Sequence, residues 1–86
     1  MVLEEETGRV THYFAKIGVA VVRLNGELKK GDRVRIKGKT TNFEQIVDSM
    51  QIQNKNIEVA KPGDEIGLKV YSRVRENDVI YKILEK

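Results

Sequence analysis

Four cationic side chains recur at every second position along one short segment: Arg33, Arg35, Lys37 and Lys39. In an extended strand, alternate residues point to the same face and lie about 6.6 Å apart. Val34 and Ile36 stand between them and suit a core-facing side. Such a row of cations predicts a nucleic-acid-binding track along a phosphate backbone. A solvated strand face, on which Lys and Arg discourage edge-to-edge pairing, explains the same row equally well.

Other residues that could do chemistry are few. His12 is the single histidine and the chain has no cysteine, which excludes a metal site built from several such ligands. No candidate base lies beside Ser49 or Ser72 in the sequence. Gly38–Thr40 resembles the end of a phosphate-binding loop, but the full motif requires glycine at position 33, which is arginine. We therefore expect no catalytic residue, no enzyme activity, no nucleotide, no metal and no cofactor.

A repeated tetrapeptide, Lys-x-Gly-Asp, precedes two segments of alternating apolar and polar residues. It opens Lys29–Lys37 and again Lys61–Lys69, and a weaker copy starts at Arg75. Glycine accepts the positive φ of a tight turn, and aspartate can hold the turn through its own backbone. The pattern predicts half-buried strands after structural turns at Gly31, Asp32, Gly63 and Asp64. Repetition of this unit is typical of a small barrel or sandwich.

Strand-like composition or alternation marks five segments: Gly8–Phe14, Ile17–Leu24, Arg33–Lys37, Glu65–Val70 and Asp78–Leu84. In the first segment, His12 shares its parity with Val10 and Phe14, which predicts a partly buried, structural histidine. The second segment is a dense apolar run, and we expect it to be buried on both faces, or nearly so.

One segment has the spacing of a helix. Its apolar residues follow the i, i+3, i+4, i+7 pattern of a helical face: Phe43, Ile46, Val47 and Met50. Thr41, with Glu44 three residues later, imitates a capping box. Local rules alone therefore predict a helix over Thr41–Gln51.

Length and composition predict one globular domain, residues 1–86 with a core over 8–84. The chain has 40% apolar and 34% charged residues and a net charge of +3, which permits an acidic partner without requiring one. No stretch approaches the ~20 apolar residues of a membrane span. The acidic start Glu4-Glu5-Glu6 differs from a signal peptide. We expect a cytoplasmic protein with no membrane partner.

Three motifs in order carry a family resemblance. They lie in Leu28–Ile36, Val47–Gln51 and Ala60–Leu68. In this order they resemble the second domain of elongation factor Tu and related translational GTPases, and the chain is similar to stand-alone translation elongation factor-like proteins. The resemblance covers Gly8 to Ile83 and implies a small closed antiparallel β-barrel of six or seven strands. It also assigns Phe43–Ile52 to an irregular strand in place of the helix.

The resemblance implies a role in translation. In that family the barrel helps to hold the aminoacylated end of transfer RNA or contacts the ribosome. This chain departs from the family pattern at Leu24-Asn25 and at Tyr71–Arg73, where the aminoacyl pocket would form. We expect a non-catalytic module that binds tRNA, rRNA or a protein of the translation machinery through the basic row. The alternative is an accessory barrel that binds an acidic protein, since a similar barrel closes some peptidase-family proteins.

Overall fold

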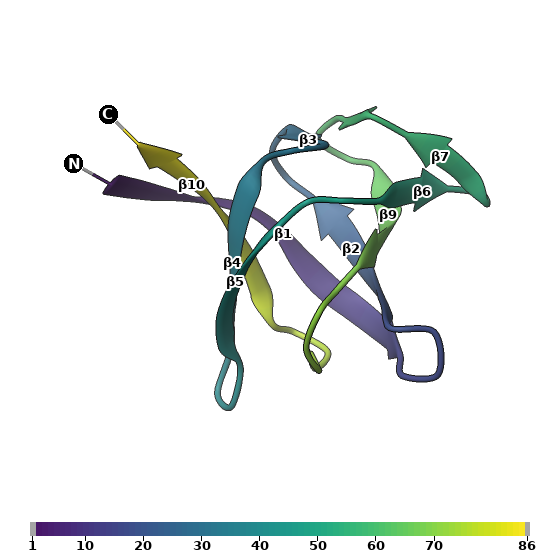
Figure 1. Cartoon of the computed structure of the whole chain (residues 1–86), viewed down its shortest axis with the longest axis horizontal. Coiled ribbons are helices and arrows are strands. Elements are labelled where there is room, and N and C mark those ends of the chain that lie inside the picture. The colour runs from purple at the N-terminus through teal and green to yellow at the C-terminus, as the bar shows by residue number, and fades with distance from the viewer. Residues whose placement is uncertain (1, 86) are drawn as a thin grey trace.

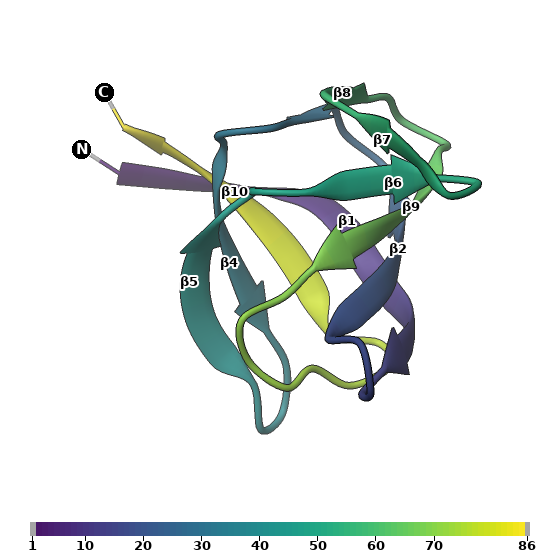
Figure 2. The same ribbon diagram turned by 45° about the vertical axis from the view of Figure 1, so that its right-hand side comes forward.

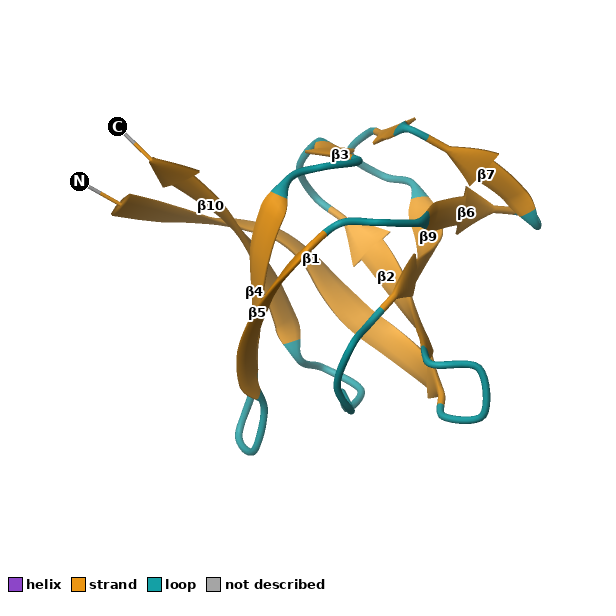
Figure 3. Ribbon diagram, viewed as in Figure 1, coloured by secondary structure: helices purple, strands orange, loops and turns teal. Residues whose placement is uncertain are grey.

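The computed structural model describes residues 2–85, and over these residues it is all-β (Figures 1 and 3). The strands are β1 Val2–Phe14, β2 Val19–Leu24, β3 Leu28–Lys29, β4 Arg33–Lys37, β5 Asn42–Ile46, β6 Met50–Ile52, β7 Lys55–Ile57, β8 Val59–Ala60, β9 Glu65–Lys69 and β10 Val79–Glu85. The outer ends of β1 and β10 project together from the body (Figure 2). Residues 2–85 contain no helix long and apolar enough to cross a membrane.

Eight strands form one antiparallel sheet in the order β5-β4-β10-β1-β2-β9-β6-β7, and β3 pairs with β8. The all-β prediction is confirmed, but the closed barrel is wrong for the part of the chain described, because the edge strands β5 and β7 do not pair. The physical reason lies after Ile46. There the chain leaves the ladder and Val47 bonds to the corner before β4: Val47 N donates to Asp32 O, and Gly31 N donates to Val47 O, each at 2.8 Å.

A side chain joins the two parts of the sheet that backbone pairing leaves apart. Gln45 on β5 is only 5% exposed. Its Nε2 donates to Lys69 O at 2.8 Å, and its Oε1 accepts from Tyr71 N at 3.0 Å. Gln45 therefore connects the edge strand β5 to the end of β9 without a strand ladder.

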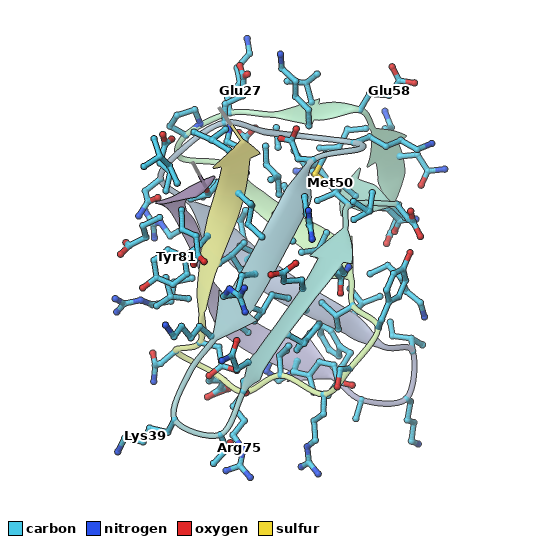
Figure 4. All side chains as sticks on the ribbon, turned by 60° about the vertical axis from the view of Figure 1, so that its left-hand side comes forward. Glu27, Lys39, Met50, Glu58, Arg75 and Tyr81 are labelled. Atoms are coloured by element: carbon cyan, nitrogen blue, oxygen red, sulfur yellow. The ribbon has the colours of Figure 1, made fainter. Side chains whose placement is uncertain are left out.

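The concave face of the curved sheet encloses the core. Alternate residues of β2 point inward, so Ala20, Val22 and Leu24 are buried while Val19 and Val21 are half-buried on the outer face. This differs from the prediction of a strand buried on both faces, or nearly so, because Val19 and Val21 are only half-buried and Arg23 is exposed. Met50 points into the interior (Figure 4). The other buried apolar residues are Val10, Leu28, Val34, Ile36, Val47, Ala60, Ile66, Leu68, Val70, Val74 and Ile80.

The segment with helical spacing is extended. Asn42–Ile46 is β5, an irregular passage follows, and β6 begins at Met50. Gln45 points inward while Ile46 is 44% exposed, which a helical face would not allow. In one continuous strand, Val47 and Met50 would point to opposite faces. The break between β5 and β6 shifts the alternation by one residue, so that both side chains are buried. The helical spacing is an accident of this break, and the irregular strand is the correct reading.

Two irregularities in β1 change which side chains face the core. The register shifts between Glu6 and Gly8 and again between Val10 and His12. As a result Val10 is buried, Tyr13 packs against the core, and His12 is exposed. The prediction of a partly buried histidine is wrong because a bulge reverses the parity that it assumed.

Three corners of the fold share one geometry. Gly31, Gly63 and Asn77 have φ of 96°, 92° and 74°. In each corner the next residue is an aspartate whose Oδ2 accepts from the backbone N three positions earlier, at 2.9 Å: Asp32 from Lys29, Asp64 from Lys61 and Asp78 from Arg75. Positive φ at the third position and Pro62 at the second are typical of a type II turn.

We expect Gly31→Val and Gly63→Val each to lower the free energy of unfolding by about 1–2 kcal/mol. A Cβ at either position would meet no atom within 4 Å, so the cost arises from the positive φ and not from a clash. Gly31→Asn is the matched control, because Asn77 already occupies the equivalent position of the third corner. Urea unfolding measures the difference. Equal stability of the valine and asparagine variants would contradict this account of the corners.

Candidate functional site

The basic row lies on β4, between β10 and β5. Arg33 and Lys37 are exposed on its outer face, and Arg35 is half-buried there. Lys39 belongs to the tight turn closed by Gly38 N donating to Thr41 O at 2.7 Å. Figure 4 shows it at the tip of this hairpin, pointing to solvent. Three of the four predicted residues therefore share a strand face, and Lys39 stands apart from it.

Both arginines of the row form ion pairs with carboxylates. Arg33 Nη2 lies 2.9 Å from Glu44 Oε2, and Arg35 Nε lies 3.1 Å from Glu4 Oε2. Arg35 also bonds to Glu44 and donates from Nη1 to Asn42 Oδ1 at 2.9 Å. Glu44 stands opposite Arg35 in the β4–β5 register, and Glu4 comes from β1. The sequence could not indicate these partners, because they depend on strand pairing. The first half of the row, Arg33 and Arg35, is therefore a neutralised network of charges.

Ser49 and His12 lie in different surroundings within residues 2–85. Ser49 lines a hollow of about 390 Å³ together with Lys30 and Asp48, but its hydroxyl has no hydrogen bond to a base there. His12 Nδ1 lies 3.6 Å from Glu76 Oε2 on the surface. No cluster of three or more His, Asp or Glu side chains in this range could hold a metal ion.

A different surface carries a hollow with no charged residue in its lining. An uncharged groove of about 230 Å³ lies on the outer face of the sheet, over β2, β9 and β6. Its floor is a row across three strands, because Val21 pairs with Gly67 and Gly67 pairs with Gln51. Gly67 has no side chain, so the row dips at β9. The lining residues are Phe14, Ile17, Val19, Val21, Gln51, Gln53, Asn54 and Gly67.

Two tight hairpins border the uncharged groove. Between β1 and β2, Gly18 has φ of 65°, and its N donates to Phe14 O at 2.9 Å. This turn presents Phe14 and Ile17, which are 47% and 60% exposed. Between β6 and β7, Gln53 and Asn54 have φ of 51° and 65°. The groove therefore joins exposed apolar surface on one side to side-chain amides on the other.

The sequence contains a signal for this groove, but the signal has two interpretations. The apolar run from Ile17 to Val21 contains more apolar residues than one buried face needs. A strand buried on both faces explains that excess, and so does an exposed apolar surface. The periodicity of a strand cannot separate these two readings.

Comparison with curated proteins finds relatives named as proteases. The chain is 44% identical over 81 residues to an uncharacterized protease of Methanocaldococcus jannaschii. It is 34% identical over 77 residues to the collagenase of Porphyromonas gingivalis. These matches cover 93% and 87% of this chain but only 20% and 21% of the relatives. The chain thus spans about one fifth of the length of the curated relatives that it matches. No family model matches it.

The fold has solved counterparts. Two crystal structures, one a selenomethionine variant, show the C-terminal domain of a Geobacillus thermoleovorans protein assigned to the U32 peptidases. They match with TM-scores of 0.85 and 0.83, and both are 23% identical to this chain. The matches cover 91% and 88% of this chain and 91% and 96% of those domains. At this identity the similarity shows the fold.

These relatives correct the expectations that the resemblance produced. They are named as proteases and collagenases, and the similar structures come from a U32 peptidase, so the elongation factor-like assignment is wrong. The expected role in translation and RNA binding is overturned with it, and the acidic-partner alternative has no support. The expectation of no enzyme activity is contradicted as well, because the relatives are named as proteases or collagenases. The misleading motifs hold corner and core residues such as Gly31 and Val34, which build a fold and do not specify a function.

Proposed function

We propose that this chain is a polypeptide-binding domain of the U32-peptidase type, and that it serves peptide-bond hydrolysis by holding the substrate. The observation that carries the proposal is the 44% identity, over 81 residues, to a region of an archaeal protein named as a protease. The name collagenase on two further relatives supports a polypeptide as the substrate class. The cytoplasmic location that the composition predicts stays part of this proposal.

A holding domain contributes to hydrolysis through proximity. When one segment of a long polypeptide is bound, neighbouring peptide bonds reach the catalytic centre at a raised effective concentration. The uncharged groove is suited to this task, because it offers exposed apolar side chains beside amide groups on a rigid sheet. The matched region is about one fifth of each relative, so the remaining four fifths can supply the groups that cleave the bond.

Binding of a labelled polypeptide tests this function. We expect the fluorescence anisotropy of fluorescein-labelled gelatin, a denatured collagen, to rise to saturation as the chain is added. The affinity should be similar at about 0.15 M and about 1 M salt, because a contact through uncharged groups is not screened. Fluorescein-labelled dextran, a polymer without peptide groups, is the control and should give no rise. Failure of gelatin to saturate at either salt concentration would contradict the proposal.

A further inference from the structure

We infer that the uncharged groove holds one large apolar side chain of an extended polypeptide, while its side-chain amides bind the neighbouring peptide groups. This inference rests on the proposed function and adds a place and a ligand chemistry to it. It follows from the shape of the groove, the charge of its lining, the hydrogen-bonding groups on its border and the fixed conformation of its loops.

The shape of the groove fits a single side chain. Val21, Gly67 and Gln51 stand in one row across adjacent strands, and the missing side chain at Gly67 leaves a trough between the other two. A Cβ built on Gly67 would lie 3.3 Å from Val19 Cγ1, a tight contact, so a side chain there would press against Val19 and narrow the trough. The hollow of about 230 Å³ is smaller than the roughly 300–1,000 Å³ of small-molecule pockets.

The lining favours a neutral ligand. None of the eight described residues that line the groove is charged, although 34% of the chain is charged. Lys69 stands opposite Val19 in the β2–β9 register, and its ammonium donates from Nζ to Ile17 O at 2.9 Å. A cationic group placed against Val19 and Val21 would lose its hydration without gaining a partner. The apolar floor of the groove therefore suits a neutral occupant.

The amides on the border distinguish a polypeptide from a purely apolar ligand. Gln51, Gln53 and Asn54 each carry a donor and an acceptor. A peptide group needs one of each, whereas a hydrocarbon needs neither. Gln51 Nε2 donates to Asn56 Oδ1 at 3.0 Å, which fixes the orientation of its amide and leaves Oε1 as an acceptor.

The groove is formed before any ligand binds. Lys69 and Gly18 hold the loop that carries Ile17, through the bonds from Lys69 Nζ to Ile17 O and from Gly18 N to Phe14 O. On the other side, Gln53 and Asn54 form a turn only two residues long between β6 and β7. Binding to preformed loops avoids most of the entropy cost of ordering them.

Two single substitutions test the groove in the gelatin titration, and a third serves as their control. Gly67→Val fills the trough; its φ is ordinary and a β-branched residue suits a strand, and the exposed-face Val19 has to shift by a few tenths of an ångström to admit the Cβ. Ile17→Asp places a charge on an exposed apolar position of the groove. We expect each to weaken gelatin binding by about tenfold or more. Val59→Asp is the matched control, since Val59 is 46% exposed on β8 outside the groove, and it should change the affinity by less than about twofold.

The outcomes separate the inference from the proposed function. If the wild-type chain binds gelatin and all three variants bind it equally well, the groove is the wrong site and the function stands. If the wild-type chain does not bind gelatin, the function itself fails. Sedimentation of the chain alone should show a monomer. A dimer that Ile17→Asp dissociates would overturn the inference by showing that a second copy fills the groove.

Discussion

Replacing Gly38 by alanine is expected to lower the free energy of unfolding by about 2–3 kcal/mol. A Cβ on Gly38 would lie 1.9 Å from Asp78 Oδ1 and 2.7 Å from its Cγ. The carboxylate cannot easily turn away, because Asp78 is only 4% exposed and its Oδ2 accepts from Arg75 N at 2.9 Å. The variant must therefore shift the β4–β5 hairpin or break the third corner. Urea or thermal unfolding measures the loss.

Two controls make this result specific. Gly26→Ala should be close to neutral, because a Cβ there meets no atom nearer than 3.6 Å. In an Asp78→Ala background, Gly38→Ala should cost much less than in the wild type, since the clashing oxygen is gone. An equal cost of Gly38→Ala in both backgrounds would contradict the proposed contact between the hairpin and the corner.

Replacing Gln45 by alanine should also lower the free energy of unfolding by about 2–3 kcal/mol. The amide makes two hydrogen bonds to backbone groups that have no ladder partner across this part of the sheet, Lys69 O and Tyr71 N. In the variant, Lys69 O and Tyr71 N lose these hydrogen bonds, and a space opens beside the core. The same change at the exposed Gln51, whose amide bonds only to Asn56, should cost less than about 0.5 kcal/mol.

Hydrogen exchange gives Gln45→Ala a second measurement. The Tyr71 amide should lose protection in the variant, because the Gln45 Oε1 that accepts its hydrogen bond is gone. Amides in the centre of β2 should keep their relative protection, since the β1–β2–β9 ladder does not involve Gln45. Unchanged protection of Tyr71 would show that Gln45 does not connect β5 to β9.

The parts of this fold that the sequence predicts are the local ones. A corner is defined within four residues, so glycine, aspartate and proline at fixed spacing indicate it directly. The all-β class follows from the alternation after those corners. Three long-range features could not be predicted from the sequence. They are the bulge that turns His12 outward, the inward-pointing amide of Gln45 and the open strand order of the sheet. Each depends on which strands meet and in which register.

The basic row and the uncharged groove show the same difference between local features, which the sequence predicts, and long-range features, which it does not. Alternation along β4 places Arg33, Arg35 and Lys37 on one face, but only strand pairing brings Glu44 and Glu4 against the two arginines. The groove was missed for the opposite reason. Its residues look like core residues in the sequence, and the glycine that shapes it, Gly67, is indistinguishable from a polar-face position of an alternating strand.

The most direct measurement is a ¹⁵N–¹H NMR titration of the chain with acetyl-Gly-Gly-Phe-Gly-Gly-amide, a neutral peptide with one large apolar side chain. The groove account predicts that backbone amide shifts will concentrate at Ile17–Val21, Gln51–Asn54 and Gly67. The amide chemical shifts of Arg33–Lys37, on the basic strand, should not change. Chemical-shift changes centred on that strand would contradict the groove account. So would the absence of any change at peptide concentrations equal to those at which gelatin saturates the chain.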